Sequence, residues 1–381
     1  MKIKLYNKID QIGLKQFDEK YTVGEDVTDE DGILVRSANL LETEFPANLK
    51  AIARAGAGVN NIPVDECAKK GIVVFNTPGA NANAVKELTI CGLLLTSRKI
   101  IQGYEWARTV EENFSKTVEK GKSAFAGHEL YRKKLGVIGL GAIGANVANA
   151  ALDLGMDVYG YDPYISIQAA WNLNHQVKHV DKLDELLKEV DYLTIHIPSL
   201  ETTKGFINKE TIDKMKDGVK ILNFARGDLV KEEDLIEALS NGKVENYITD
   251  FGSQALCKLD NVICLPHLGA STAESEENCA VMAVHEIMDY LENGNIVNSV
   301  NMPDISEAWN TKIRVCIIHM NVPNMLAQFA TLIANNHINI ENMSNKARKD
   351  YAYTIIDTND PIDPELFEKI ENVIKVRILQ K

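Results

Sequence analysis

One histidine of the sequence is placed as a catalytic base would be. His267 follows the apolar run VICLP and precedes the small-residue turn LGAST. An imidazole titrates near neutrality and can exchange a proton with a substrate, and such a base is usually steadied by a carboxylate. Arg226 in LNFARGDLV and Asp250 in YITDF also follow apolar runs. Read alone, His267 would more often be a buried structural histidine and Arg226 one half of a surface ion pair.

A glycine motif that suits a dinucleotide lies upstream of these residues. Gly139, Gly141 and Gly144 form the pattern GxGxxG between a strand pattern and a helix pattern, and Asp162 ends the next strand pattern, VYGYD. The first glycine permits a tight turn, the second lets the backbone approach a pyrophosphate, and the third allows close helix–strand packing. The helix N-terminus offers free N–H groups to the phosphates. Asp162 would bind ribose hydroxyls and repel a 2′-phosphate, which favours NAD over NADP; the bland alternative is a structural glycine turn.

These residues fall in a strand–helix series that starts at Leu135. Its six strand patterns are KLGVIGLG, DVYGYDP, YLTIHIP, VKILNFARG, NYITDF and VICLPH, and they predict a doubly wound parallel sheet. Ligands bind at the carboxyl ends of such strands, where the arginine, the aspartate and the histidine would all lie. The runs at 32–37, 49–56 and 71–78 predict a second parallel sheet in the first hundred residues.

Two helix patterns and a C-terminal module complete the predicted architecture. Residues 83–107 predict one long helix that crosses between domains, and Ser271-Thr-Ala-Glu274 has the spacing of a capping box that opens a second long helix. The last seventy residues alternate as strand, helix, strand, strand, helix and strand, which is a ferredoxin-like pattern. The predicted fold class is α/β, with two doubly wound parallel-sheet domains and a C-terminal ferredoxin-like βαββαβ domain.

Composition restricts the classes of function. The chain has 381 residues, 45% of them apolar, and a formal net charge of −13, which argues against nucleic-acid binding because the chain would repel a phosphate backbone. Its six cysteines form no CxxC pair, so a reduced protein without a metal site is expected. No signal peptide and no apolar run of membrane-spanning length is present in the sequence, so we expect a cytoplasmic protein without a membrane partner.

Taken together, the motifs resemble those of the D-isomer-specific 2-hydroxyacid dehydrogenase family, and within it the phosphoglycerate dehydrogenases that carry a C-terminal ACT domain. The motifs are NTPGANANAVKEL, GVIGLGAIG, NFARGDLV and PHLGAST, and the resemblance covers nearly the whole chain. It implies NAD-dependent oxidation of 3-phospho-D-glycerate to 3-phosphohydroxypyruvate, the first step of serine biosynthesis. It also implies a discontinuous substrate-binding domain (1–98 and 285–310), a Rossmann domain (99–284) and an ACT domain (311–381).

The resemblance implies a role for each matching residue. Arg226 would bind the substrate carboxylate and polarise the C2 oxygen, and His267 would take the C2 hydroxyl proton while NAD+ receives hydride. Asp250 would hold the nicotinamide carboxamide. The other cofactor contacts would be Gly139, Gly141, Ala142, Ile143, Gly144, Asp162, Pro198, Thr203, Ala225 and Gly269. The substrate contacts would be Arg36, Ser37, Arg54, Ala57 and Asn81, and the two arginines could hold a phosphate.

The C-terminal module resembles the ligand-binding turn of ACT domains. His319, Asn321 and Asn339 match the positions that bind L-serine across a domain dimer in serine-inhibited relatives, so the chain is expected to form a homodimer or homotetramer. Asn324 stands where the family often has glycine, and asparagine tolerates a positive φ better than most residues. The alternative is a purely structural dimerisation module.

One position departs from the family pattern. A glutamate that pairs with the histidine lies five residues after the family's aspartate, and this chain has Ala255 there. Two other classes of function stay open. The first keeps the same chemistry with another substrate: a glyoxylate or hydroxypyruvate reductase, or another D-2-hydroxyacid dehydrogenase. The second is a non-enzymatic NAD-sensing protein like the C-terminal-binding corepressors.

Overall fold

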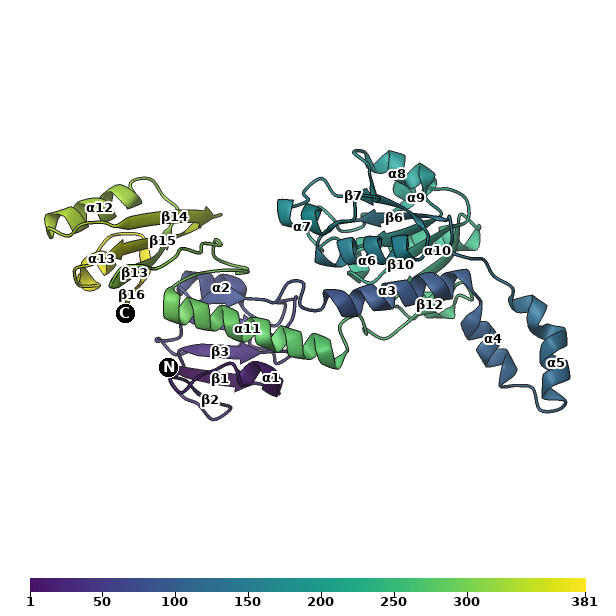
Figure 1. The fold of residues 1–381 in the computed structure, drawn as a ribbon, viewed down its shortest axis with the longest axis horizontal. Coiled ribbons are helices and arrows are strands. Elements are labelled where there is room, and N and C mark those ends of the chain that lie inside the picture. Colours follow the sequence, from purple (N-terminus) through teal and green to yellow (C-terminus); the bar gives the residue numbers. More distant parts are fainter. The chain divides into compact units, whose positions relative to one another are not determined.

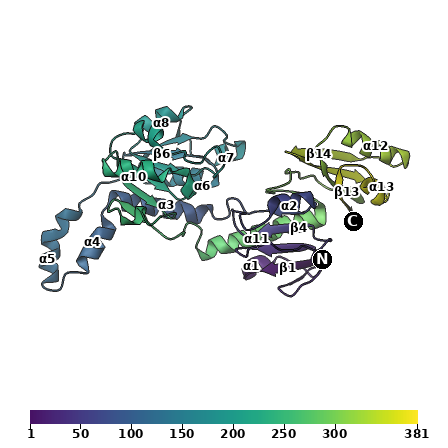
Figure 2. The ribbon, with the colours of Figure 1, turned by 180° about the vertical axis from the view of Figure 1, so that it is seen from behind.

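The computed structural model describes residues 1–381, except for the side chain of Gln168. Its contacts divide the chain into two units, one formed by Met1–Asn81 with Ala273–Lys381 and the other by Ala82–Thr272. Most elements of each unit are labelled in Figure 1, and Figure 2 shows the ribbon from behind.

The unit of residues 82–272 is built on a seven-stranded sheet of order β12-β11-β10-β9-β6-β7-β8, in which all pairs are parallel. The central strands β9 and β10 are buried along their whole length, as expected of strands covered on both faces. The chain reverses direction across the sheet between β6 and β9, which is the topological switch point of a Rossmann fold. The predicted doubly wound sheet is confirmed. Its strands are β6 (Lys134–Ile138), β7 (Asp157–Tyr161), β8 (Lys178–His179), β9 (Tyr192–Ile195), β10 (Val219–Asn223), β11 (Val244–Thr249) and β12 (Val262–Cys264).

Helices connect these strands, with short 3-10 turns at three places. They are α6 (Ala142–Asp153), α7 (Ile167–Asn172), α8 (Leu183–Glu189), α9 (Lys209–Asp213) and α10 (Glu232–Ser240), together with η2 (Gly227–Leu229) and η3 (Leu256–Lys258). α5 (Phe114–Gly121) and η1 (Lys122–Phe125) precede β6.

The helix predicted over residues 83–107 is two helices, α3 (Ala82–Ser97) and α4 (Ile100–Ala107), so the prediction of one helix is wrong. The hydroxyl of Ser97 donates to the carbonyl of Leu93 at 2.8 Å, and the carbonyl of Ser97 accepts from the N–H of His128 at 2.9 Å. Of these two bonds, the one from His128 occupies the Ser97 carbonyl that a continuing helix would use. A run of apolar residues does not reveal them.

The first sheet of the other unit has five parallel strands in the order β2-β1-β3-β4-β5, which confirms the second parallel sheet. Its helix α11 (Ala273–Asn293) buries Ala280, Ala283 and Ile287, and Gly13 lets α1 approach it, since an added Cβ would lie 2.6 Å from Ala280 Cβ. The strands are β1 (Lys2–Tyr6), β2 (Thr22–Gly24), β3 (Gly32–Val35), β4 (Ala51–Arg54) and β5 (Val73–Phe75), and the other helices are α1 (Gln11–Leu14) and α2 (Val64–Lys69).

Residues 313–380 form the predicted βαββαβ module. Its four-stranded antiparallel sheet has the order β14-β15-β13-β16, and Phe329 and Phe367 are fully buried in its core. The elements are β13 (Ile313–Met320), α12 (Met325–Asn335), β14 (Asn342–Arg348), β15 (Tyr351–Thr358), α13 (Glu365–Glu368) and β16 (Val373–Gln380). The ferredoxin-like topology is therefore confirmed.

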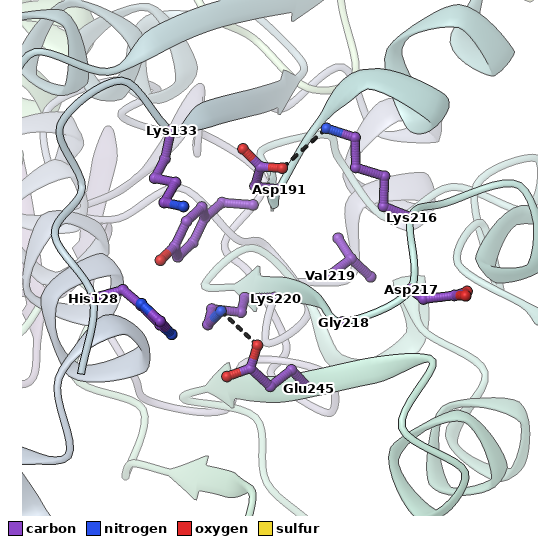
Figure 3. A pocket seen from close by; sticks show the side chains of 10 residues that line it. His128, Lys133, Asp191, Lys216, Asp217, Gly218, Val219, Lys220 and Glu245 are labelled. Atoms are coloured by element: carbon purple, nitrogen blue, oxygen red, sulfur yellow. Dashed lines mark hydrogen bonds and ion pairs between the residues drawn. The ribbon is translucent and has the colours of Figure 1, made fainter. Parts of the chain in front are cut away.

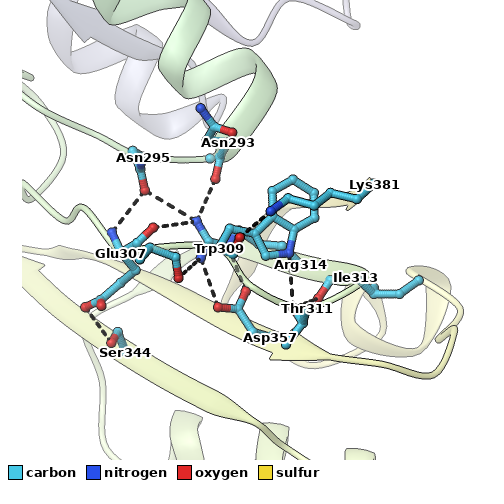
Figure 4. Close-up of polar contacts among 12 residues, drawn as sticks. Asn293, Asn295, Glu307, Trp309, Thr311, Ile313, Arg314, Ser344, Asp357 and Lys381 are labelled. Carbon is cyan, nitrogen blue, oxygen red and sulfur yellow. Dashed lines mark hydrogen bonds and ion pairs between the residues drawn. The ribbon is translucent and has the colours of Figure 1, made fainter.

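A buried arginine fastens this module to the segment before it (Figure 4). Arg314 is fully buried and forms a two-pronged ion pair with Asp357, with Nε–Oδ1 at 2.7 Å and Nη2–Oδ2 at 2.9 Å. Its remaining N–H groups donate to the carbonyls of Asn293, Glu307 and Ala308. The end of α11 and the linker are therefore hydrogen-bonded to the first strand of the module.

The division into units follows the packing of the two long helices. α3 packs on α6, β10 and β11, whereas α11 packs on α1 and β4. The domain limits expected at residues 98 and 284 stay predictions. Among the described residues, no helix is both long and apolar enough to cross a membrane.

Candidate active site

The glycine turn after β6 has the geometry of a dinucleotide cradle. Gly139 has φ +85°, and an added Cβ there would lie 2.7 Å from the carbonyl oxygen of His196, while a Cβ at Gly144 would lie 1.8 Å from the carbonyl oxygen of Gly139. At Gly141 an added Cβ would meet no described atom within 4 Å. No described side chain caps α6 at Gly141, so the N–H groups of Ala142 and Ile143 are available to a phosphate.

Asp162 joins this turn to the strand beside it. Its Oδ2 accepts the N–H of Leu140 at 2.8 Å, and its Oδ1 accepts the N–H of Tyr164 at 2.9 Å. Each oxygen keeps a second lone pair with which it can accept a ribose hydroxyl. The predicted ribose residue is thus fixed by the backbone of the glycine turn itself.

Asp250 lies at the end of β11 and is 3% exposed. Its Oδ2 accepts the N–H of Gly269 at 2.9 Å, but its Oδ1 has no hydrogen-bond partner among the described residues. Burial raises the pKa of this carboxyl group. An unpartnered buried acceptor is costly, and the NH₂ group of a carboxamide would satisfy it. Together with the glycine turn, this oxygen indicates that the residues fit NAD.

Arg226 projects from the loop after β10 and is exposed. Its Nη1 donates to the carbonyl of Ala225 at 2.6 Å, and no described carboxylate lies within ion-pairing distance. Asn223, fully buried at the end of β10, donates to the carbonyl of Arg226 at 2.8 Å and accepts the N–H of Ala225 at 3.1 Å. Sequence reasoning missed Asn223, although a polar residue ending an apolar strand could have signalled it.

His267 lies in the bend after β12 and is exposed. The ring of Phe251 packs against it, with 4.5 Å between ring centroids. Among the described residues, none donates or accepts a hydrogen bond at the imidazole, and Ala255 lies at the start of η3 with an exposed side chain. The histidine therefore keeps an aromatic neighbour but has no carboxylate partner in its unit.

The loops after β9 and β10 are tied together near the same edge of the sheet. Thr203 Oγ1 donates to the carbonyl of Pro198 at 2.7 Å and accepts the N–H of Leu200 at 2.8 Å. Ser199 Oγ donates to Asp228 Oδ2 at 2.6 Å. Pro198 and Thr203 thus form one turn, as their assignment to a common cofactor contact requires.

A second histidine at the switch point was not anticipated. His196 directly follows β9, its backbone N–H donates to the carbonyl of Ile138 at 2.8 Å, and its Nε2 lies 3.0 Å from Thr194 Oγ1. Burial lowers the pKa of His196 to about 3, so the ring is neutral at physiological pH. Its Nδ1 has no described hydrogen-bond partner. The motif YLTIHIP carried the signal, since it puts a histidine at a strand end.

In the other unit, the expected substrate residues lie at the carboxyl ends of β3 and β4. Arg36 Nη2 pairs with Glu276 Oε1 at 2.6 Å, and Arg54 Nε donates to the carbonyl of Arg36 at 2.9 Å. The N–H of Ser37 donates to Asn7 Oδ1 at 3.1 Å. The structure brings the two arginines together. The carbonyl of Ala57 accepts from Asn76 Nδ2 at 2.5 Å, and Asn81 is the last residue of the first segment of this unit.

The three expected effector residues differ in exposure. His319 is buried, with Nδ1 donating to the carbonyl of Met320 at 2.8 Å and Nε2 2.9 Å from Thr354 Oγ1, and burial lowers its pKa. Asn321 and Asn339 are exposed. Asn324 has φ 73°, so asparagine does adopt the left-handed conformation expected at this turn.

A polar cavity of about 200 Å³ lies at the opposite, amino-terminal edge of the seven-stranded sheet (Figure 3). Lys216 pairs with Asp191 at 3.0 Å and Lys220 with Glu245 at 2.7 Å on its wall, and Lys133 also lines it. Cofactors bind at carboxyl ends of strands, so this cavity is not the dinucleotide site. Within the described part of the chain, no group of three His, Cys, Asp or Glu side chains could hold a metal ion.

Comparison with known proteins first identifies the unit of residues 82–272. The family model described as D-isomer specific 2-hydroxyacid dehydrogenase, NAD binding domain, matches residues 90–269. The D-3-phosphoglycerate dehydrogenase of Methanocaldococcus jannaschii is 35% identical over an alignment of 346 residues that covers 88% of this chain and 64% of that protein. The hydroxypyruvate reductase of Thermotoga maritima is 41% identical over an alignment of 273 residues that covers 68% of this chain and 85% of that protein.

Solved structures agree with these sequence matches. The crystal structure of NAD+-bound 3-phosphoglycerate dehydrogenase from Entamoeba histolytica is similar with a TM-score of 0.62 and 29% identity, over 79% of this chain and 98% of that chain. Several curated D-3-phosphoglycerate dehydrogenases are longer proteins, of which this chain spans only about half to two thirds. The glycine turn, the buried Asp250 and these matches lead to one conclusion: the chain belongs to the D-isomer-specific 2-hydroxyacid dehydrogenase family and carries its NAD-binding domain.

Proposed function

We propose that this chain is a cytoplasmic NAD-dependent enzyme that oxidises 3-phospho-D-glycerate to 3-phosphohydroxypyruvate. The observation that carries the proposal is the extent of the match to the M. jannaschii D-3-phosphoglycerate dehydrogenase. The match covers 88% of this chain, which is a larger share than residues 1–310 make up, so the similarity continues into the C-terminal module. A relative named for this reaction is therefore similar in all three parts of the chain.

The residues of each unit suit the steps of such a reaction. Arg226 has no competing carboxylate among the described residues and is held by the buried Asn223, so its planar fork can receive the substrate carboxylate. Bound NAD+ supplies the hydride acceptor. His267 takes the proton of the C2 hydroxyl as that hydride leaves, and its exposed ring can return the proton to solvent.

The neighbouring arginines of the other unit support a phosphorylated substrate. Arg54 ends β4 and Arg36 directly follows β3, a parallel neighbour in which Val35 lies opposite Arg54. Two guanidinium groups can share the charge of one phosphate. Glu276 already engages Arg36, so a phosphate must compete with this carboxylate.

The proposal is tested by following NADH in the presence of 3-phosphohydroxypyruvate. We expect NADH consumption that is abolished in His267→Ala and reduced by several orders of magnitude in Arg226→Ala, because the charge that develops on the substrate oxygen in the transition state loses its partner. Failure to reduce 3-phosphohydroxypyruvate, with rapid reduction of other 2-oxoacids, would overturn the substrate assignment. Turnover that survives in His267→Ala would overturn the role of the histidine.

A second candidate is a hydroxypyruvate or glyoxylate reductase. It is favoured by the 41% identity to the T. maritima hydroxypyruvate reductase, although that match is short enough to omit the C-terminal module. Replacing Arg54 by Ala separates the two functions: loss confined to the phosphorylated substrate supports phosphoglycerate oxidation, whereas equal loss on both supports the alternative.

We also propose that L-serine binds the C-terminal module of a homodimer or homotetramer. Asn321 and Asn339 are exposed and carry amide groups that suit a bound amino acid. Both ring nitrogens of His319 already have hydrogen-bond partners, so His319 would stabilise the turn and would not contact the amino acid directly. Isothermal titration with L-serine tests this: binding lost in Asn321→Ala supports it, and no binding heat at millimolar serine contradicts it.

A further inference from the structure

We propose that Cys257 and Cys264 form a reversible disulfide at the base of the loop that carries His267. All six cysteines are free in the structure, and these two belong to elements that pack against each other. Cys257 lies in η3 and is exposed, whereas Cys264 is the last residue of β12 and is partly buried. No role in binding or proton transfer has been assigned to either thiol.

The two sulfurs converge on a space left by a glycine. A Cβ added at Gly252 would lie 2.7 Å from Sγ of Cys264 and 3.2 Å from Sγ of Cys257. The two sulfurs can therefore be no further apart than the sum of these two distances. A side chain at residue 252 would separate them, so glycine at this position keeps the pair together.

The chemistry of the pair assigns different roles to the two thiols. Cys257 is accessible, so its thiolate attacks a soluble disulfide such as glutathione disulfide and releases one glutathione thiolate. The Cys264 thiol then loses its proton and attacks the Cys257 sulfur, which releases the second glutathione. The balance is two protein thiols and one glutathione disulfide converted to one protein disulfide and two glutathione thiols. Burial raises the pKa of Cys264, so the second step is the slower one and accelerates at alkaline pH.

Closing this bond would fix the loop between β11 and β12. Phe251 lies next to Gly252 in that loop and packs against His267, and His267 itself follows Cys264 by three residues. A disulfide would thus tie the loop that contains Phe251 to the strand end that precedes His267. Oxidation is expected to change kcat, because this segment sets the position of the imidazole of His267.

The test is to incubate the reduced full-length chain with glutathione disulfide and to count its thiols after denaturation. We expect the count to fall from six to four, and peptide mapping to locate the bond. Trypsin cuts at Lys258, between the two cysteines, and a protease that cuts after glutamate separates Cys264 from Cys279 at Glu274. The linked peptide should lose two hydrogens and reappear as two peptides after reduction.

Matched variants decide between this pair and other cysteines. Cys257→Ser and Cys264→Ser should each prevent the loss of two thiols, whereas Cys91→Ser, at the other exposed cysteine, should leave it unchanged. The thiol count does not depend on catalysis, so it stands even if the proposed activity fails. A stable glutathione adduct on Cys257 that Cys264 never resolves, or a disulfide that survives in Cys257→Ser, would overturn the proposal.

Discussion

At the residue scale, the feature that most affects the proposed activity is His267, whose imidazole forms no hydrogen bond with a described residue. Its ring contacts Phe251 but no described carboxylate, and Ala255 occupies the position where the family pattern has glutamate. A carboxylate partner fixes the tautomer of a catalytic imidazole and stabilises its charged form. The chain therefore has the base without the group that usually orients it.

Restoring the acid should accelerate the reaction. We expect Ala255→Glu to raise kcat about tenfold or more, a fraction of the roughly 10⁴-fold effect of the aspartate in a serine-protease triad. Residue 255 is exposed, so the new carboxylate costs little desolvation. The measurement is kcat with NADH and 3-phosphohydroxypyruvate, with Ala255→Gln as the uncharged control. Equal rates for the Glu and Gln variants would mean that charge at this position does not matter.

A second residue-scale prediction concerns Glu276, which holds Arg36 at 2.6 Å. The two side chains are 41% and 42% exposed, so the ion pair should contribute less than about 1 kcal/mol to stability. Glu276→Gln frees the guanidinium for phosphate, and we expect KM for 3-phosphohydroxypyruvate to fall several-fold while KM for hydroxypyruvate stays constant. Glu277→Gln is the neighbouring control. A parallel change in both KM values would show that Glu276 acts on the site as a whole.

At the element scale, the connection between α11 and β13 depends on one buried cation. Arg314 pairs with Asp357 and hydrogen-bonds three backbone carbonyls, and Trp309 stacks on its guanidinium with 5.3 Å to the ring centroid. Removing one member of a buried pair leaves the other uncompensated. The module is therefore anchored by a group whose loss affects the linker, the helix end and the sheet together.

We expect Arg314→Met to lower the free energy of unfolding by about 3–5 kcal/mol, and the double change with Asp357→Leu to recover much of this loss. Urea unfolding followed by Trp309 fluorescence, with the other two tryptophans replaced by Phe, reports on the junction. Lys369→Met, which removes an exposed pair with Glu365, should change stability by less than about 0.5 kcal/mol. A double variant no more stable than the single one would rule out the buried charge as the cause.

At the scale of the whole molecule, stability should depend on a buried carboxyl group of α11. Glu286 is 8% exposed, Asn298 donates to its Oε1 at 2.7 Å, and burial, with Asp304 adding to it, raises its pKa to about 8. The folded chain therefore binds a proton between pH 4.5 and 8 that the unfolded chain has released. The contribution of Glu286 to the free energy of unfolding is therefore fully present below pH 4.5 and is lost as the pH rises toward 8.

Glu286→Gln removes this dependence, because glutamine keeps the hydrogen bond without a titratable charge. We expect the variant to gain stability over the wild type as pH increases from about 5 to 8.5, by about 1.4 kcal/mol for each unit of pKa shift at most. Thermal unfolding at several pH values is the measurement, with the exposed Glu274→Gln as control. A constant difference between the Glu286→Gln variant and wild type across this range would contradict the shifted pKa.

Much of this molecule could be read from local patterns. The strand runs, the glycine turn and the βαββαβ order depend on periodicity and on backbone conformations such as φ +85° at Gly139, which short stretches of sequence specify. The break between α3 and α4 could not be read in this way, because it depends on a bond from Ser97 to residue 128. His196 and Asn223 each stand at the end of an apolar strand pattern, which is a local signal, but their hydrogen-bond partners appear only in the tertiary structure.

The sequence by itself determined the fold class, the dinucleotide motif and the order of the chemically active residues, since these follow from residue types at fixed spacings. Only the tertiary structure decided which groups have partners: Asp250 keeps an unbonded oxygen, Arg36 is engaged by Glu276, His319 is buried, and the thiols of Cys257 and Cys264 meet beside Gly252. These relations connect residues that lie far apart along the chain or that face each other across a loop. Their formation depends on packing, which no local pattern encodes.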